Sequence, residues 1–288
     1  MIPSPLRSPL RHRITHVNGV HLHIVESGDD SAPPVILLHG FPEFWYGWRN
    51  QVDALVDAGF RVVMPDQRGY NLSAKPEGAH AYTLDALAAD VIGIMDDLGA
   101  TKTPIIGHDW GGGVAWWLAN KFPERVEKLT VLNVPHHNVF TQAVKHNPKQ
   151  RRRSAYMAFF QLDHIAEAVC AFGNYRVLAG VFAGNPAFTA EDIRAYKAAW
   201  QQPGALTAML NWYRAAQRHR VVPAESQRIT VPTLLIWGMK DPAFIPELAA
   251  QSIAQCDDGR MERIPNASHW VQHEAAAQVN RLLVEWLG

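Results

Sequence analysis

Short apolar runs alternate with helix-like segments along much of the chain, and this alternation restricts the possible folds more than any other feature of the sequence. Residues 83–98 carry apolar side chains at helical spacing, with Thr83 as a candidate cap before them and Gly99 as a stop after them. Buried strands are predicted at residues 35–38, 61–65, 103–107, 129–133, 233–237 and 260–264. Strands and helices in alternation predict an α/β fold, in which helices cover a mostly parallel sheet.

One long segment interrupts this alternation. From residue 136 to residue 222 the sequence shows helical patterns and no convincing strand, and the alternation resumes only afterwards. We therefore predict a core domain formed by residues 1–135 and 223–288, with residues 136–222 inserted as a helical cap. The remaining elements are expected as strands at residues 12–17 and 20–26, joined by a hairpin turn at Asn18-Gly19, and as helices at residues 45–58, 111–122, 156–172, 190–200, 204–217, 245–255 and 274–287.

The charge balance excludes several kinds of partner. The chain has 27 Lys+Arg and 27 Asp+Glu, so it lacks the basic excess with which nucleic-acid-binding proteins neutralise phosphates. No run approaches the ~20 apolar residues of a membrane helix, and no secretory signal is visible. We expect no nucleic-acid or membrane partner, a cytoplasmic location, and a monomer or homodimer. The basic run at residues 149–153 is expected to be a solvated face of the cap.

The chemistry depends on one motif at a strand-to-helix junction. Residues 107–111 read Gly-His-Asp-Trp-Gly, which is the G-x-S-x-G pattern of a nucleophile elbow with aspartate at the serine position. Such a turn lifts the side chain of Asp109 above the edge of the sheet, in front of the backbone N–H groups of the following helix. The pattern alone is weak, since Asp109 could simply cap that helix.

Three further signals follow in the order expected for a catalytic triad built on this turn. The sequence His39-Gly40-Phe41-Pro42 follows the first core strand, where an oxyanion-binding loop belongs. Asp241 follows the strand predicted at residues 233–237, and His269 follows the strand predicted at residues 260–264. Nucleophile, acid and histidine in this order are typical of α/β hydrolases, so the signals together are strong.

Over nearly its whole length the chain resembles α/β hydrolases of the epoxide hydrolase family. The resemblance rests on HGFPEFW at residues 39–45, DQRGYNLS at 66–73, HDWGG at 108–112, NWYR at 211–214 and SH at 268–269. It implies the α/β-hydrolase fold, an eight-stranded sheet with an inserted helical cap, and a cis peptide bond between Phe41 and Pro42. It also implies that two cap tyrosines, Tyr156 and Tyr213, point at the nucleophile.

An aspartate nucleophile indicates attack on a saturated carbon. A serine would be left as an ether that the enzyme cannot hydrolyse, whereas a carboxylate forms an ester that an activated water can open. We expect Asp109 to form an alkyl ester, and His269, oriented by Asp241, to activate the water. The backbone N–H groups of Phe41 and Trp110 would stabilise the resulting oxyanion.

The leading hypothesis is an epoxide hydrolase, without cofactor, that converts a small apolar epoxide and water to a vicinal diol. Tyr156 and Tyr213 would polarise and protonate the epoxide oxygen, since a phenol stays protonated at neutral pH. A haloalkane dehalogenase with the same nucleophile is the alternative, but Phe41 offers no side-chain donor where that family commonly carries an asparagine. Fluoroacetate-type dehalogenases carry arginines just after the nucleophile, where this chain has residues 112–114, Gly-Gly-Val. A ligand-binding protein on a hydrolase scaffold is a third hypothesis, and the complete set of reactive residues argues against it.

A substrate pocket is expected around these residues. Its predicted lining consists of His108, Pro42, Trp45, Phe160, His136 and Trp270, although His108 is more typical of a core histidine. No metal site is predicted, because His269 and His273 have helical i,i+4 spacing without an HExxH motif. His21 and His23 share one face of a predicted strand, which we expect to face solvent.

Overall fold

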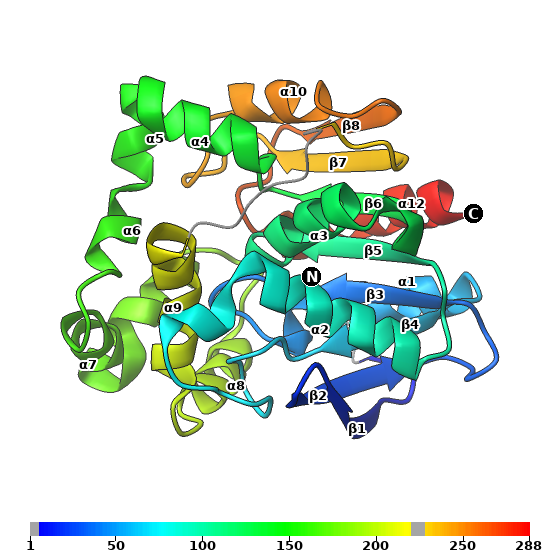
Figure 1. The fold of residues 1–288 in the computed structure, drawn as a ribbon, viewed down its shortest axis with the longest axis horizontal. Helices are drawn as coiled ribbons and strands as arrows, with labels where there is room; N and C mark the ends of the chain where they lie inside the picture. The colour runs from blue at the N-terminus through cyan, green and yellow to red at the C-terminus, as the bar shows by residue number, and fades with distance from the viewer. Residues whose placement is uncertain (1–5, 220–227) are drawn as a thin grey trace.

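The computed structural model describes residues 6–219 and 228–288, and its centre is one eight-stranded sheet (Figure 1). The strand order is β1-β2-β4-β3-β5-β6-β7-β8, in which β2 pairs antiparallel with β1 and β4 and all other neighbours run parallel. The predicted α/β architecture is therefore confirmed. The strands are β1 Arg11–Val17, β2 Val20–Ser27, β3 Pro34–Leu38, β4 Arg61–Pro65, β5 Thr103–His108, β6 Val126–Leu132, β7 Thr233–Gly238 and β8 Gly259–Ile264.

Helices cover the sheet and also gather beyond one end of its strands, where Figure 1 shows α5, α6, α7, α8 and α9. These helices belong to the segment between β6 and β7, and the predicted boundary between residues 222 and 223 lies outside the described residues. The α-helices are α1 Val52–Asp57, α2 Leu84–Asp97, α3 Trp110–Lys121, α4 His137–His146, α5 Pro148–Arg153, α6 Ala155–Phe159, α7 Ile165–Ala179, α8 Ala190–Trp200, α9 Ala205–Arg218, α10 Glu247–Ile253, α11 Val271–Glu274 and α12 Ala276–Leu287; short 3-10 helices are η1 Trp45–Trp48, η2 Ala79–Tyr82, η3 Pro123–Arg125 and η4 Gly180–Phe182.

Alternate side chains of the central strands enter two separate cores, one on each face of the sheet. In β3, Ile36 and Leu38 join the core that includes the buried residues of α2 and α3. Val35 and Leu37 of the same strand join the core that includes the buried residues of α1 and α12. Because apolar helices cover both faces, these strands are hydrophobic at nearly every position, and short apolar runs were a sufficient signal for them.

The structure differs from the prediction of one cap helix at residues 156–172. Helix α6 ends at Phe159 and α7 begins only at Ile165, because His164 between them adopts a left-handed backbone with a φ of 66°. Within α7 the residues 172–175 are again non-helical. Apolar side chains continue at helical spacing on both sides of each break, so periodicity did not reveal either one.

Two smaller differences concern helix lengths and membrane propensity. Residues 45–58 fold into η1 and α1 rather than one helix, and the last helix begins at Ala276. Contrary to our expectation, the segment Ile165–Phe182 is long and apolar enough by composition to cross a membrane. The break at residues 172–175 interrupts the continuous backbone hydrogen bonding that a membrane-spanning helix requires.

The junction between β5 and α3 is compact because glycines stand where backbones meet. A Cβ atom on Gly111 would overlap the carbonyl groups of Leu38 and His39, and one on Gly107 would overlap the backbone of Gly111. The glycines therefore allow the first turn of α3 to lie directly against β3 and β5, at the carboxyl end of both strands.

We expect Gly111→Ala to lower the free energy of unfolding by about 1–3 kcal/mol or more, because backbone atoms surround the new methyl group. Gly113→Ala in the same helix is the matched control, since its Cβ would meet nothing closer than 3.8 Å. That substitution should raise the free energy of unfolding by roughly 0.5–1 kcal/mol. Urea denaturation of both variants measures the difference, and equal effects would contradict the packing argument.

Candidate active site

Asp109 stands at the turn between β5 and α3 in a backbone conformation that is rare for a residue with a side chain. Its φ is 49° and its ψ is −122°, outside the regions that most residues occupy. The side chain makes no capping hydrogen bond to α3, so helix capping does not explain the aspartate. The turn instead directs the carboxylate towards the loops that follow β3 and β8.

The structure brings Asp109, Asp241 and His269 together beyond the ends of three strands. Nδ1 of His269 lies 2.9 Å from Oδ2 of Asp241, and Nε2 of His269 lies 3.5 Å from Oδ2 of Asp109. Asp109, Asp241 and His269 are 8%, 2% and 7% exposed. The histidine therefore lies between two buried carboxylates and directs one ring nitrogen at each.

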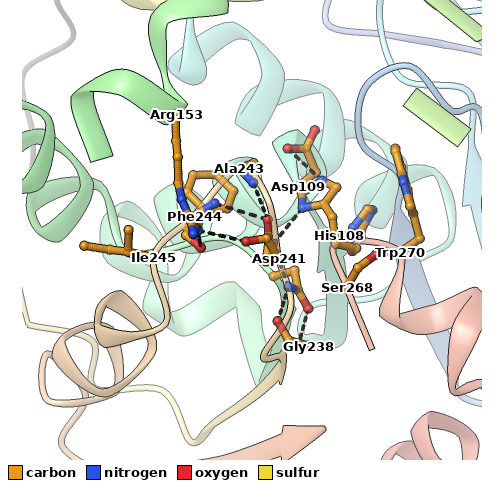
Figure 2. A network of polar contacts seen from close by, with 12 residues as sticks. His108, Asp109, Arg153, Gly238, Asp241, Ala243, Phe244, Ile245, Ser268 and Trp270 are labelled. Atoms are coloured by element: carbon orange, nitrogen blue, oxygen red, sulfur yellow. Dashed lines mark hydrogen bonds and ion pairs between the residues drawn. The ribbon is translucent and has the colours of Figure 1, made fainter. Parts of the chain in front are cut away.

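Hydrogen bonds hold Asp241 in one orientation (Figure 2). Its Oδ1 accepts from the backbone N–H groups of Ala243 at 2.7 Å and Phe244 at 3.1 Å. Its Oδ2, which faces His269, also accepts from Nδ2 of Asn133 at 2.7 Å. Asn133 directly follows β6, and it is absent from the predicted site although side chains just beyond the carboxyl ends of parallel strands commonly contribute to sites.

The predicted oxyanion loop reaches the nucleophile from the end of β3. The backbone N–H of Phe41 donates to Oδ1 of Asp109 at 2.8 Å, and the expected cis peptide bond between Phe41 and Pro42 is present. Trp110 is the first residue of α3, so its backbone N–H is one of those that have no acceptor within the helix. Oδ1 therefore faces a backbone donor, whereas Oδ2 faces His269.

Tyr156 of α6 and Tyr213 of α9 meet above this loop. The ring centroid of Tyr213 lies 5.2 Å from that of Phe41, 5.0 Å from that of Trp110 and 5.9 Å from that of Tyr156. Tyr213 is buried, whereas Tyr156 keeps 37% of its surface exposed. Burial and then the charge of Asp109 raise the pKa of Tyr156, while a hydrogen bond with Tyr213 acts in the opposite direction. Burial likewise raises the pKa of Tyr213 well above its ordinary value.

A buried polar cluster behind the histidine was not predicted. Glu43 accepts from the Tyr196 hydroxyl at 2.6 Å, and its Oε1 lies 2.8 Å from Nε2 of His273. Although burial acts to raise it, the pKa of Glu43 is held well below its ordinary value, by His273 and then His108. Nε2 of His108 in turn lies 2.8 Å from the backbone oxygen of His269. Glu43 belongs to the HGFPEFW segment, but its partner His273 stands 230 residues away in the chain, so no local pattern connects them.

Three of the predicted pocket residues lie between the triad, the oxyanion loop and the cap. The ring centroid of Phe160 lies 4.9 Å from that of Tyr213. Trp270 stands between the triad and the cap, with its ring 4.9 Å from His269 and 4.7 Å from Phe182 of η4. Pro42 is buried, and its carbonyl oxygen accepts from Nε1 of a cap residue, Trp200, at 2.6 Å. The oxyanion loop is thus attached to the cap.

The other three predicted pocket residues face elsewhere. His108 is 0% exposed and therefore lies in the core behind the triad, without surface to offer a ligand. Trp45 packs edge-on against His12 of β1, with 5.7 Å between ring centroids. His136 packs edge-on against Trp116 of α3 at 5.5 Å. Proximity in sequence to a site residue did not reveal the direction of these side chains.

Two further histidines, His23 and His273, also occupy structural positions. The expectation that His23 faces solvent is wrong: it is 4% exposed, and its Nδ1 lies 2.6 Å from Oδ2 of Asp66. His273 faces Glu43 and not a shared site with His269. Within residues 6–219 and 228–288, no group of three or more His, Cys, Asp or Glu side chains could hold a metal ion.

Comparisons with known proteins agree with this fold. A family model for the alpha/beta hydrolase fold matches residues 33–276. The chain belongs to the α/β-hydrolase family. AB hydrolase superfamily protein YfhM of Bacillus subtilis (strain 168) is 47% identical over 96% of this chain and 97% of its own. Epoxide hydrolase 4 of Homo sapiens is 38% identical over 94% of this chain and 76% of its own. A crystal structure of Bacillus megaterium epoxide hydrolase with an inhibitor matches with a TM-score of 0.87 and 33% identity, covering 96% of this chain and 99% of that chain.

Two carboxylates set the protonation of the histidine in this epoxide-hydrolase-like α/β hydrolase. Burial alone would lower the pKa of His269, but Asp241 and then Asp109 outweigh it and raise the pKa to about 10. Burial also acts to raise the pKa of Asp109, yet His269 holds that pKa below its ordinary value. At neutral pH His269 is therefore an imidazolium beside the ionised Asp109 carboxylate.

The raised pKa of His269 predicts how the stability of the protein depends on pH. A group with a pKa of about 6.5 when unfolded and about 10 when folded contributes stability that is complete below pH 6.5. That contribution is lost as the pH rises through about 10. The difference in free energy of unfolding between the wild-type protein and His269→Gln should therefore shrink between pH 6.5 and pH 10. Denaturation across this range measures it, and a difference independent of pH would contradict the assigned charge.

Proposed function

We propose that this α/β hydrolase is an epoxide hydrolase that converts a small apolar epoxide and water to a vicinal diol. The observation that carries the proposal is the ionised Asp109 carboxylate opposite two desolvated cap phenols, Tyr156 and Tyr213. Opening an epoxide needs both at once, because a nucleophile attacks the saturated carbon while an acid protonates the departing oxygen.

In the first step, Oδ2 of Asp109 attacks a carbon of the epoxide and the ring carbon–oxygen bond breaks. Oδ2 is the available oxygen, since Oδ1 accepts from the Phe41 N–H. The epoxide oxygen takes a proton from Tyr156 or Tyr213, whose raised pKa keeps both phenols protonated at neutral pH. The product of this step is a hydroxyalkyl ester of Asp109.

The second step uses the change of charge that the first step produces. Esterification removes the negative charge of Asp109, which is one of the two charges that raise the pKa of His269. The imidazolium then releases its proton, which restores the phenol, and neutral His269 becomes a base. His269 takes a proton from water, and the hydroxide adds to the ester carbonyl.

The ester oxygen that becomes negative is Oδ1, which faces the N–H of Phe41, while the N–H of Trp110 is the second donor in this proposal. The diol leaves with a proton from His269. The Asp109 carboxylic acid that remains returns its proton to His269, so the starting charges are restored. The oxygen of the water stays in the Asp109 carboxylate, and a proton of the water has passed through His269 to the diol. No metal ion or cofactor takes part in these steps.

The relatives support an apolar substrate. Several are named epoxide hydrolases. A mutant of the Bacillus megaterium epoxide hydrolase was crystallised with its product, (R)-3-[1]naphthyloxy-propane-1,2-diol. The surroundings of Asp109 in the present chain are aromatic, with Phe41, Trp110 and Phe160 beside Tyr213, and such side chains favour an apolar or aryl substituent.

A haloalkane dehalogenase is the alternative, since it would use the same nucleophile. A departing halide needs N–H donors that are free to receive an anion. Here the Trp110 ring packs edge-on against the Tyr213 ring, with 5.0 Å between ring centroids, and Phe41 has no side-chain donor. The donors present are therefore better matched to an epoxide oxygen than to a halide, and release of halide from chloroalkanes without epoxide turnover would establish the alternative.

A cytoplasmic location and a monomer or homodimer remain predictions.

His269→Gln should accumulate the ester on Asp109, because the variant retains the nucleophile and the phenols but lacks the base of the second step. Intact-mass spectrometry after mixing with styrene oxide should show one added substrate mass, located on Asp109 by peptide mapping. In ¹⁸O water, the wild-type protein should give an unlabelled diol in its first turnover and label in Asp109. A labelled diol in the first turnover would show direct attack by water and contradict the covalent route.

The two phenols predict a loss confined to the first step. Tyr156→Phe and Tyr213→Phe should each slow ester formation on the order of 100-fold, which is the lower end of the rate effect of general acid catalysis. The double variant should not form the ester. Tyr175→Phe is the matched control, because this cap hydroxyl donates to the Trp200 carbonyl, away from the triad. Rapid-quench kinetics of ester formation measures the effect, and a control variant as slow as the other two would show that the phenols are not the acids.

A further inference from the structure

The basic segment of the cap is only partly a solvated surface. Arg151 and Arg152 of α5 are exposed, as expected for a charged helix face, but Gln150 is 0% exposed and Arg153 is half-buried. Both inward-facing side chains are directed at the loop that follows β7 and contains Asp241 (Figure 2 shows Arg153).

Arg153 and Gln150 together bind four backbone groups of that loop. Nη1 of Arg153 donates to the carbonyl oxygens of Asp241 at 2.8 Å and Phe244 at 2.5 Å. Nε2 of Gln150 donates to the Ala243 carbonyl at 2.8 Å, and its Oε1 accepts from the Ile245 N–H at 3.0 Å. Hydrogen bonds from a guanidinium are among the stronger ones in proteins, and a buried amide left without partners would be costly.

These contacts add to those that Asp241 makes itself. The Asp241 carboxylate binds the N–H groups of Ala243 and Phe244, whereas the cap binds three carbonyl groups and the N–H of Ile245. The loop is therefore held through both kinds of backbone group, from its own carboxylate and from the cap.

We propose that Arg153 and Gln150 are positioning residues for the hydrolytic step, because they fix the Asp241 loop and thereby the orientation of His269. This inference rests on the proposed function. Neither side chain contacts the reacting atoms, so neither is a catalytic residue. The effect belongs to the second step, since Asp241 and His269 activate the water whereas Asp109 and the phenols form the ester.

Arg153→Met should slow hydrolysis of the Asp109 ester on the order of 10- to 100-fold, which is the range expected for a small misplacement of a catalytic group. Ester formation should change much less, although Arg153 stands only three residues before Tyr156. Single-turnover mass spectrometry with styrene oxide follows both rate constants in one experiment. Arg152→Met is the matched control on the exposed side of α5, and its two rate constants should equal those of the wild type.

Arg153→Lys and Gln150→Leu complete the test. Lysine can still donate to a carbonyl group and should restore most of the hydrolysis rate, whereas Gln150→Leu should slow hydrolysis selectively, as Arg153→Met does. Hydrogen exchange of the Ala243, Phe244 and Ile245 amides should be faster in Arg153→Met, a readout that needs no substrate. Equal slowing of both steps, or rates like those of Arg152→Met, would overturn the inference. A different result would overturn the proposed function but not the role of the loop contacts. In that case the wild-type protein would form no Asp109 ester, while hydrogen exchange of the loop amides would still be faster in Arg153→Met.

Discussion

The left-handed backbone of Asp109, between β5 and α3, is the constraint on which the other residues of the site depend. A residue with a side chain adopts this conformation only where its surroundings enforce it. Here Gly107 and Gly111 allow the first turn of α3 to lie directly against β3 and β5. The same approach brings the Phe41 N–H to Oδ1 of Asp109. One turn therefore presents the nucleophile and also brings it to a backbone donor.

The loops after β3, β5, β7 and β8 all reach the same end of the sheet because these strands run parallel. Each loop is then fixed by a partner far away in sequence. Asn133, which directly follows β6, holds Asp241, and Glu43 of the oxyanion loop holds His273. The cap contributes in the same way, since Trp200 binds the Pro42 carbonyl and Gln150 binds the loop of Asp241. The site is thus a set of loops that stabilise one another.

The fold and the triad could be predicted because their signals are local or ordered along the chain. Each buried strand, and the pair of elbow glycines, is recognised from a stretch of only a few residues. Asp109, Asp241 and His269 appear in the order that their strands require. The contacts of Glu43, Asn133 and Arg153 could not be predicted, since each joins segments that only the folded chain brings together. For Arg153 the reason is the geometry of the helix. A run of charged residues suggests a solvated surface, but a helix directs successive side chains around its axis, so some residues of the run face inward.

The hydrogen bonds around Asp241 match a requirement of the proposed mechanism. In the proposed mechanism an imidazolium lies between Asp109 and Asp241, and after ester formation the neutral imidazole no longer offsets the Asp241 carboxylate. A neutral epoxide brings no counter-ion, so the protein itself must stabilise that remaining buried anion. Four donors do so: the Ala243 and Phe244 N–H groups, the Asn133 amide and His269. Those donors stay aligned only if the loop keeps its shape, and the Arg153 and Gln150 contacts to its backbone meet that requirement without adding a further ligand to the carboxylate.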